Sequence, residues 1–248
     1  MKLARKRILS ITAAAIAIAG LGQLSVPAAS AETSTGWIGG TPPVNGTVYL
    51  HSSTINNVPR PLASSIVYTS FGTQAPAGTM GAMARLFREG ALCSATDYLY
   101  NAAPNSSQNV ATSRDCGAGW YNSHGFVAVW NGTSYSQYVT FPSSALQYPA
   151  PAAAPLTAPD APSVDIPSGT NSEGQSFGSG AEVTNDADLP DLVSAIGVNG
   201  IEGYVRSTDL VTTPPNELTT THGAGTRSIP VLAEDGQTVI DNFEIRAS

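Results

Sequence analysis

The sequence predicts a mostly β protein with an N-terminal all-β domain of sandwich or barrel-like form, a Pro/Ala-rich linker and a small C-terminal α+β domain. Short β-branched and aromatic runs recur between Gly, Pro, Asn and Ser throughout the first half. Six prolines interleaved with alanine then fall between Pro149 and Pro167. With 42% hydrophobic and 12% charged residues, the composition is that of a globular chain and excludes a disordered polyelectrolyte or a coiled coil.

The first 31 residues have the pattern of a secretory signal peptide. Both lysines of the chain lie in the basic segment 1–7, and an apolar stretch over residues 8–26 follows it. Ala29-Ser30-Ala31 fits the small-x-small recognition of signal peptidase, so we expect cleavage after Ala31. The uninterrupted apolar part is shorter than the about 20 residues of a membrane span. We therefore expect a secreted, extracellular protein with no integral membrane segment in the mature chain.

Proline and charge place the expected domain boundaries. The proline run favours extended polyproline II, which predicts a semi-rigid linker over residues 149–167. Residues 32–148 carry four acids, four arginines and 15 of the 18 aromatics, whereas residues 149–248 carry 14 of the 18 acids and three arginines. We expect a neutral, aromatic domain over 32–148 and an acidic one over 168–248. An acidic surface repels phosphate, which argues against a nucleic-acid partner.

The apolar runs of the first domain predict its strands, which cover Thr47–His51, Ile66–Phe71, Ala82–Phe87 and Phe126–Trp130. Asn131-Gly132 separates the last run from a second alternating run. Because Asn-Gly suits the positive φ of a type I′ turn, we expect a two-residue hairpin with one buried aromatic face. The side chains expected on that face are Phe126, Ala128, Trp130, Tyr135, Val139 and Phe141.

Cys93 and Cys116 are the only cysteines, and both lie in the part expected to be exported. An oxidising compartment favours joining them, so we expect a disulfide, which also removes the free thiol that a cysteine nucleophile needs. Closing a loop of this length stabilises the fold by roughly 3 kcal/mol in the chain-entropy model.

The second domain is expected to contain one short helix and several strands. Asp188 suits an N-cap, and Leu189, Leu192, Val193 and Ile196 have the spacing of a helix face that Gly197 ends. Capping and the helix dipole explain the acids near Asp188, although their oxygens would also suit calcium. We expect strands at Gly203–Arg206, Ile229–Leu232 and Thr238–Ile245, the last two joined in a hairpin around Asp235-Gly236.

Three histidines, His51, His124 and His222, lie in unrelated stretches without a carboxylate or second histidine at metal-ligand spacing. We therefore expect no metal and no cofactor. His124 stands in a polar turn before a strand and is the one weak candidate for catalysis, as a general base. The simpler interpretation is that His124 and Asn122 hydrogen-bond the local backbone.

Aromatic and polar side chains of the two domains supply weak candidates for binding, since exposed rings stack on sugars. A structural role in the core explains the rings equally well. The binding candidates are Trp120, Tyr121, Asn122, His124, Tyr204 and Arg206.

The second half resembles a module at the end of many exported proteins of Gram-positive bacteria. The motifs that carry the resemblance are Asn171–Ser179, Asp188–Leu192, Asn199–Leu210 and Ile229–Ile240. Gly203-Tyr204-Val205-Arg206 also resembles one strand of the small bacterial SH3-like barrels that bind wall peptides. The first half, through residues 120–125 and 139–142, is similar to secreted actinobacterial proteins of unassigned function. The resemblance implies export and this domain division, and it implies no catalytic role.

These observations predict a secreted, non-catalytic, two-domain protein that binds a wall component or a protein partner at or near the cell surface. The sequence lacks a Ser-x-x-Lys pair and a Walker loop. Two alternatives stay open. One is an extracellular hydrolase that uses His124 with a first-domain carboxylate, and the other is a secreted inhibitor that presents the loop between Cys93 and Cys116. The carboxylates available to the hydrolase are Glu89, Asp97 and Asp115.

Overall fold

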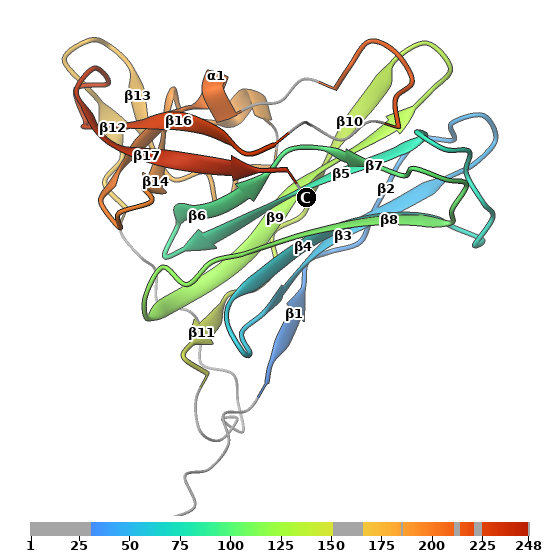
Figure 1. Cartoon of the computed structure of the whole chain (residues 1–248), viewed down its shortest axis with the longest axis horizontal. Helices are drawn as coiled ribbons and strands as arrows, with labels where there is room; N and C mark the ends of the chain where they lie inside the picture. The colour runs from blue at the N-terminus through green and yellow to red at the C-terminus, as the bar shows by residue number, and fades with distance from the viewer. Residues whose placement is uncertain (1–30, 151–165, 185, 211–213, 221–224, 248) are drawn as a thin grey trace, which may run out of the picture.

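The structure is a computed structural model that describes residues 31–150, 166–184, 186–210, 214–220 and 225–247. Strands dominate these ranges, so the prediction of a mostly β protein is confirmed (Figure 1). The helical elements described are the four-residue helix α1 (Ser207–Leu210) and the 3₁₀ turn η1 (Asp186–Asp188). The expected signal peptide, apart from Ala31, and residues 151–165 of the expected linker lie outside the described residues. Within the described ranges, no helix has the length and apolar character needed to cross a membrane.

An antiparallel sheet forms the first layer of a β-sandwich. Along its central strands, buried and more exposed residues alternate, so that Ala63, Ser65 and Val67 of β4 point inwards. The sheet has the order β1 (Thr33–Thr35), β3 (Tyr49–Asn56), β4 (Leu62–Thr69) and β8 (Ser107–Ser113), with β2 (Gly39–Gly40) also paired to β3.

The second layer is built around β9 (Gly119–Trp130), a long strand that is buried over most of its length. Val127 and Val129 of β9 pack against Tyr49 and Val67 of the first sheet. Because side chains alternate along a strand, the even-numbered residues of β9 face away from the first sheet. The other strands of this layer are β5 (Met80–Arg88), β6 (Ala91–Thr96), β7 (Leu99–Tyr100), β10 (Tyr135–Thr140) and β11 (Leu146–Tyr148).

Strand β6 also closes a small β-barrel whose other strands come from the second half of the chain. It pairs with one end of that sheet at Leu92, opposite Ala195, and with the other end at Ala95, opposite Ile245. Figure 1 shows β6 beside β17, above the sandwich. The remaining barrel strands are β14 (Leu192–Ile196), β15 (Glu202–Arg206), β16 (Arg227–Leu232) and β17 (Val239–Arg246), and β13 (Ser176–Gly178) and β12 (Gly169–Thr170) extend from β14.

The barrel core contains side chains from both halves of the chain. Phe87 and Leu92, which precede the expected linker, pack with Val193, Val205 and Phe243 in one buried cluster. Residues on both sides of positions 151–165 therefore contribute strands to the same barrel and side chains to the same core.

The expected Asn131-Gly132 hairpin is confirmed, but its loop is longer than predicted. Trp130 pairs with Tyr135, so four residues, Asn131 to Ser134, form the loop. The Asn131 carboxamide oxygen accepts hydrogen bonds from the backbone N–H groups of Thr133 and Ser134, which favours the longer turn.

The aromatic face of this hairpin is confirmed in its main part. Phe126 and Ala128 form a cluster with Tyr135 and Val139. Phe141 lies beyond the end of β10 and is 37% exposed, so it is not part of the buried face.

The helix expected from Asp188 to Ile196 is wrong, because Leu192–Ile196 is strand β14. Leu192 packs in a cluster with Leu232, whereas Val193 packs in the barrel core. A strand that is apolar on both faces imitates the spacing of a short helix. The strand at Gly203–Arg206 and the hairpin of β16 and β17 are confirmed.

Candidate functional site

His124 and Asn122 lie within strand β9, on the face turned towards the C-terminal residues. The Nε2–H of His124 donates to the carbonyl oxygen of Gly180 at 2.7 Å, and the Asn122 amide donates to the carbonyl oxygen of Ala181 at 3.3 Å. His124 is 0% exposed, and its ring stacks on Phe87 with 4.7 Å between ring centres. The polar turn expected at this place is wrong, since both faces of β9 are covered. Both side chains do hydrogen-bond backbone groups, but these belong to a remote segment and not to the local backbone as expected.

The environment of His124 keeps its imidazole neutral. The pKa of His124 is lowered to about 3, chiefly by burial and in addition by the nearby Arg85 guanidinium, while the hydrogen bond to Gly180 acts in the opposite direction. Its Nδ1 has no hydrogen-bond partner among the described residues. The ring is surrounded by the carbonyl oxygen of Gly180, the rings of Phe87 and Phe126 and the Arg85 guanidinium.

The substitution His124→Gln should reduce the acid sensitivity of the fold. The folded-state pKa lies below the unfolded value of 6.5, so the unfolded chain binds this proton first and stability falls as pH falls from about 6.5 towards 3. Between about pH 7.5 and about pH 5, His124 should account for a loss of roughly 2 kcal/mol in the free energy of unfolding. Urea unfolding at both pH values measures this loss, which Gln should abolish.

Asn122→Ala is the matched control for that experiment, because Asn122 holds the same backbone segment but does not titrate. It should lower stability by a similar amount at both pH values. If wild type and His124→Gln lost the same free energy between the two pH values, the neutral state of His124 would be disproved.

The other histidines do not join His124. His51 is buried in β3 on the sandwich side, where Tyr49 and Ile55 of the same strand contact the second sheet, and its ring lies 6.0 Å from that of Tyr138. β9 separates it from His124, which faces the opposite side of that strand. His222 lies outside the described residues.

The three candidate carboxylates are not recorded in contact with His124, and each has a different environment. Asp97 pairs with Arg227 at 3.2 Å, and Asp115 accepts hydrogen bonds from the Gly117 N–H and the Tyr148 hydroxyl. Glu89 lies at a turn with positive φ. Among the described residues, no three His, Cys, Asp or Glu side chains are grouped so that they could hold a metal ion.

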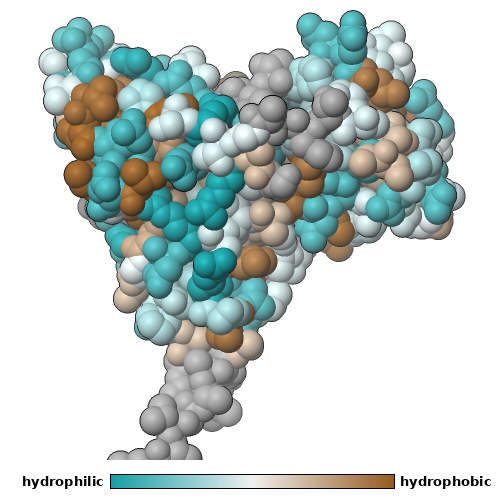
Figure 2. Space-filling view, in the orientation of Figure 1, coloured by the Kyte–Doolittle hydropathy of each residue, from teal (hydrophilic) through white to brown (hydrophobic). Residues whose placement is uncertain are grey.

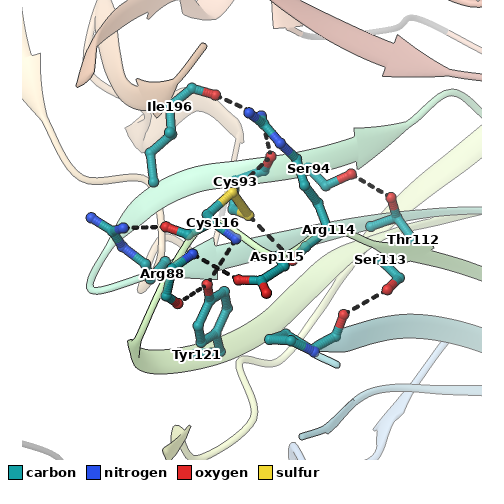
Figure 3. The surroundings of a disulfide bond; sticks show 12 residues. Arg88, Cys93, Ser94, Thr112, Ser113, Arg114, Asp115, Cys116, Tyr121 and Ile196 are labelled. Carbon is teal, nitrogen blue, oxygen red and sulfur yellow. Dashed lines mark hydrogen bonds between the residues drawn. A yellow bond between two sulfur atoms is a disulfide. The ribbon is translucent and has the colours of Figure 1, made fainter. Parts of the chain in front are cut away.

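Tyr121 belongs to the surroundings of the disulfide rather than to a shared site with His124. Cys93 and Cys116 are joined, as predicted (Figure 3). The Tyr121 hydroxyl donates to the carbonyl oxygen of Gly117 and accepts from the Cys116 N–H, which fixes the loop around Cys116. Trp120, its neighbour in β9, is partly exposed and lies opposite Gln147 of β11.

Arg114 connects the disulfide region to the barrel. Its guanidinium donates to the carbonyl oxygens of Cys93 and Ile196 at 3.1 and 2.9 Å (Figure 3). It also donates to the carbonyl oxygen of Gly197 at 2.6 Å. None of these three acceptors is a carboxylate, although Asp115 is the next residue in the chain. The guanidinium instead satisfies backbone oxygens at the end of β14, where its fork-shaped donor set can reach several acceptors.

Tyr204 and Arg206 lie on the barrel, away from β9. The Tyr204 ring packs edge-on against Phe177 at 5.5 Å, and the Arg206 guanidinium donates to the carbonyl oxygen of Gly236 at 2.8 Å. The six binding candidates thus divide among the β9 face, the disulfide loop and the barrel.

The surface presents an aromatic site that the sequence reasoning missed. Trp37 is 84% exposed and Ile38 is 61% exposed. They border a hollow of about 460 Å³ with Pro142 and Ser144, here called the Trp37 hollow. Gly36 allows the close approach of these segments, because a Cβ there would lie 2.1 Å from the carbonyl oxygen of Phe141. The signal in the sequence was a tryptophan between glycines in a short loop.

The space-filling view shows how limited such apolar areas are. On the face shown in Figure 2, hydrophobic residues form separate small patches within a mostly hydrophilic surface. Large apolar side chains that remain exposed are therefore the exception on this face, which makes them candidates for contact with a partner.

A second missed feature is a groove at the end of the sandwich, here called the end groove. Both sheets stop at this end, where β3 begins at Tyr49, β4 ends at Thr69 and β9 ends at Trp130. The groove has a volume of about 390 Å³, and Leu218 of the C-terminal half borders it. A third hollow of about 190 Å³ lies beside Arg114 and Arg246.

Comparisons with known proteins do not assign a function to these sites. No protein-family model matches the sequence, and no curated protein or solved structure matches it significantly.

Proposed function

We propose that the protein is exported and acts outside the cytoplasm as a non-catalytic binding protein at or near the cell surface. Its partner is a wall component or another protein. The basic segment, apolar stretch and Ala29-Ser30-Ala31 of the N-terminus support export. The disulfide between Cys93 and Cys116 is compatible with an oxidising compartment.

The exposed Trp37 carries the proposal. Tryptophan is a large apolar side chain that folded proteins rarely leave almost wholly in water. It is also the residue type most enriched among the few side chains that dominate binding energies. Placed beside Ile38 and the Trp37 hollow, its indole offers an aromatic surface to a partner.

The charge distribution narrows the partner class. Once the four basic residues of positions 1–7 are removed, the net charge changes from −7 to −11. A surface of this sign disfavours nucleic acids and anionic membranes. Uncharged wall glycans and proteins with basic surfaces remain compatible with it.

The substitution Trp37→Ala should abolish retention of the protein on its partner. We expect retention of the wild-type protein on purified insoluble peptidoglycan or on immobilised cell-surface glycans, measured by sedimentation. Loss of a central tryptophan should weaken binding by about 2 kcal/mol or more, which is roughly thirtyfold. Because Trp37 is exposed, its removal should leave the melting temperature nearly unchanged.

Two variants serve as controls. Trp37→Phe keeps an aromatic ring and should retain part of the binding, and Val239→Ala removes another exposed apolar side chain, located on the barrel. Val239→Ala should bind like the wild type. Failure of the wild-type protein to bind wall glycans or any surface protein, or full binding by Trp37→Ala, would contradict the proposal.

A further inference from the structure

The end groove differs from the Trp37 hollow in its chemistry. Its lining combines two aromatic rings with side chains that carry hydroxyl or amide groups, and none of the described residues that line it is charged. A groove of about 390 Å³ has the size of small-molecule sites, which have volumes of roughly 300–1,000 Å³. The side chains that the argument uses are Asn45, Tyr49, Gln74, Thr79, Trp130 and Leu218.

The floor of the groove offers an unused hydroxyl group. Tyr49 is only 4% exposed, yet its side chain makes no hydrogen bond to any residue in the described part of the chain. Burial raises the pKa of the Tyr49 phenol, which keeps it neutral and able to donate. Because Tyr49 lines the groove, this hydroxyl can form a hydrogen bond to a bound ligand. Thr79, also buried in the floor, supplies a second hydroxyl.

The aromatic wall of the groove is held in place by its neighbours. The Trp130 indole packs edge-on against Tyr135 with 5.1 Å between ring centres. The Tyr135 hydroxyl in turn donates to the carbonyl oxygen of Gly78 at 2.6 Å and accepts from the Thr219 N–H at 3.2 Å. A ring fixed in this way loses little conformational freedom when a ligand stacks on it.

The opposite rim comes from the second half of the chain. Leu218 is 48% exposed, and the adjacent Thr219 is tied to Tyr135. At Gly78, a Cβ would lie 2.6 Å from the carbonyl oxygen of Thr219, so this segment rests directly on the backbone before β5. The groove is therefore complete only when the C-terminal residues are docked on the sandwich.

We propose that the end groove binds one or two rings of a neutral saccharide. Sugars present hydroxyl groups at their edges and C–H groups on their faces. The Tyr49 and Thr79 hydroxyls and the amides of Asn45 and Gln74 match the edges, whereas Trp130 and Leu218 match the faces. A lining without charge disfavours phosphates, metal ions and charged peptides, which need a compensating charge. The inference deepens the proposed binding function by naming a ligand class, and it rests on that function for its biological setting.

A titration with uncharged tetrasaccharides tests the inference directly. The probes are chitotetraose, cellotetraose, maltotetraose and mannotetraose, and an oligogalacturonate of equal length serves as the charged comparison. The readout is the NMR resonance of each indole N–H, since the chain has three tryptophans. We expect the Trp130 indole to shift with at least one neutral probe at concentrations up to about 5 mM, while the indole of Trp120, which does not line the groove, does not shift.

Two variants separate binding from folding. Tyr49→Phe removes only the phenolic oxygen and should weaken binding about 5- to 30-fold, the range of one lost hydrogen bond to a ligand. Leu218→Ala truncates an exposed side chain and should weaken binding about threefold. Val239→Ala, which removes an exposed apolar side chain on the barrel, is the matched control and should bind the tetrasaccharide like the wild type. Tighter binding of the N-acetylated probe would indicate a wall glycan as the ligand. Tighter binding of an unacetylated probe would indicate a simple hexose polymer.

The proposal for the end groove and the proposal for the Trp37 hollow can be disproved independently of each other. If no neutral probe shifts Trp130, or if Tyr49→Phe binds as well as wild type, the saccharide site is disproved even when Trp37-dependent retention on the wall is intact. If Trp130 shifts with a probe but retention on the wall and on surface proteins is absent, the groove stands and the proposed function at the cell surface fails.

Discussion

Expressed separately, residues 32–150 and residues 166–248 will each lack a cooperative unfolding transition, whereas the full chain will unfold in a single step. Without the second half, Phe87 and Leu92 lose the barrel core in which they are buried. Without the first half, β14 and β17 lose the strand that joins them. Each large apolar side chain left in water costs about 1.5–3 kcal/mol, against a total stability of about 5–15 kcal/mol.

Two probes that report on different parts of the chain can measure this cooperativity. All three tryptophans lie in the first half, so their fluorescence follows that half, while far-ultraviolet circular dichroism follows the strands of both. We expect the two urea transitions of the full chain to coincide. Mixing the separate halves should restore a common transition. Two distinct transitions in the full chain, or a sharp transition in either isolated half, would show that the halves fold independently.

The double substitution Cys93→Ser and Cys116→Ser should lower the free energy of unfolding by roughly 3 kcal/mol. The two cysteines are 23 positions apart, so the disulfide restricts a loop of moderate length in the unfolded chain. The loss should be felt in the barrel as well as the sandwich, because Cys93 lies in β6 and the neighbouring Arg114 binds carbonyl oxygens of β14 and the residue after it.

Urea unfolding with and without a phosphine reductant measures the contribution of the disulfide. Reductant should shift the wild-type midpoint to that of the double variant and should leave the double variant unchanged. A difference below about 1 kcal/mol between oxidised and reduced wild type would contradict the expectation. The variant Ser94→Ala, next to Cys93, is a suitable control for local changes in β6, because it removes a hydrogen bond to Thr112 but no covalent link.

The sequence allowed the strands with strong local signals to be predicted. Ala82–Phe87 lies within β5 and Phe126–Trp130 forms the end of β9, because these runs are bounded by turn residues. The disulfide followed from the single pair of cysteines and the expected export to an oxidising compartment. The start of β9 was missed, since Asn122, Ser123 and His124 read as a polar turn. They are buried because the first sheet covers one face of the strand and the C-terminal residues cover the other.

The shared strand had no local signal. Residues 91–96 are mostly small, and all six are buried, since β6 lies between the sandwich and the barrel. Pairings such as Ala95 with Ile245 connect residues that are far apart in sequence, and periodicity within a short window contains no information on them. The division into two units at the proline run was likewise predicted from local composition, which contains no information on strand pairing across that run.

For the candidate sites too, the sequence indicated features that depend on neighbouring residues but not contacts between remote segments. Sequence reasoning found that His124 and Asn122 hydrogen-bond backbone groups, but not that these groups belong to Gly180 and Ala181. The end groove joins Tyr49, Trp130 and Leu218 from three remote segments. Only Trp37, between glycines, carried a local indication of exposure.

Strand β6 has a consequence for how the protein reaches its folded state. A chain that is synthesised or threaded through a membrane from its N-terminus presents β6 long before β17 is available. During that interval the sandwich has an unpaired strand edge, which is a template for pairing with another chain. Pairing over so long a sequence separation is also intrinsically slow. Pairing of β17 with β6 therefore covers this edge only at the end of folding. The time before β17 docks is the interval in which protection against aggregation matters most.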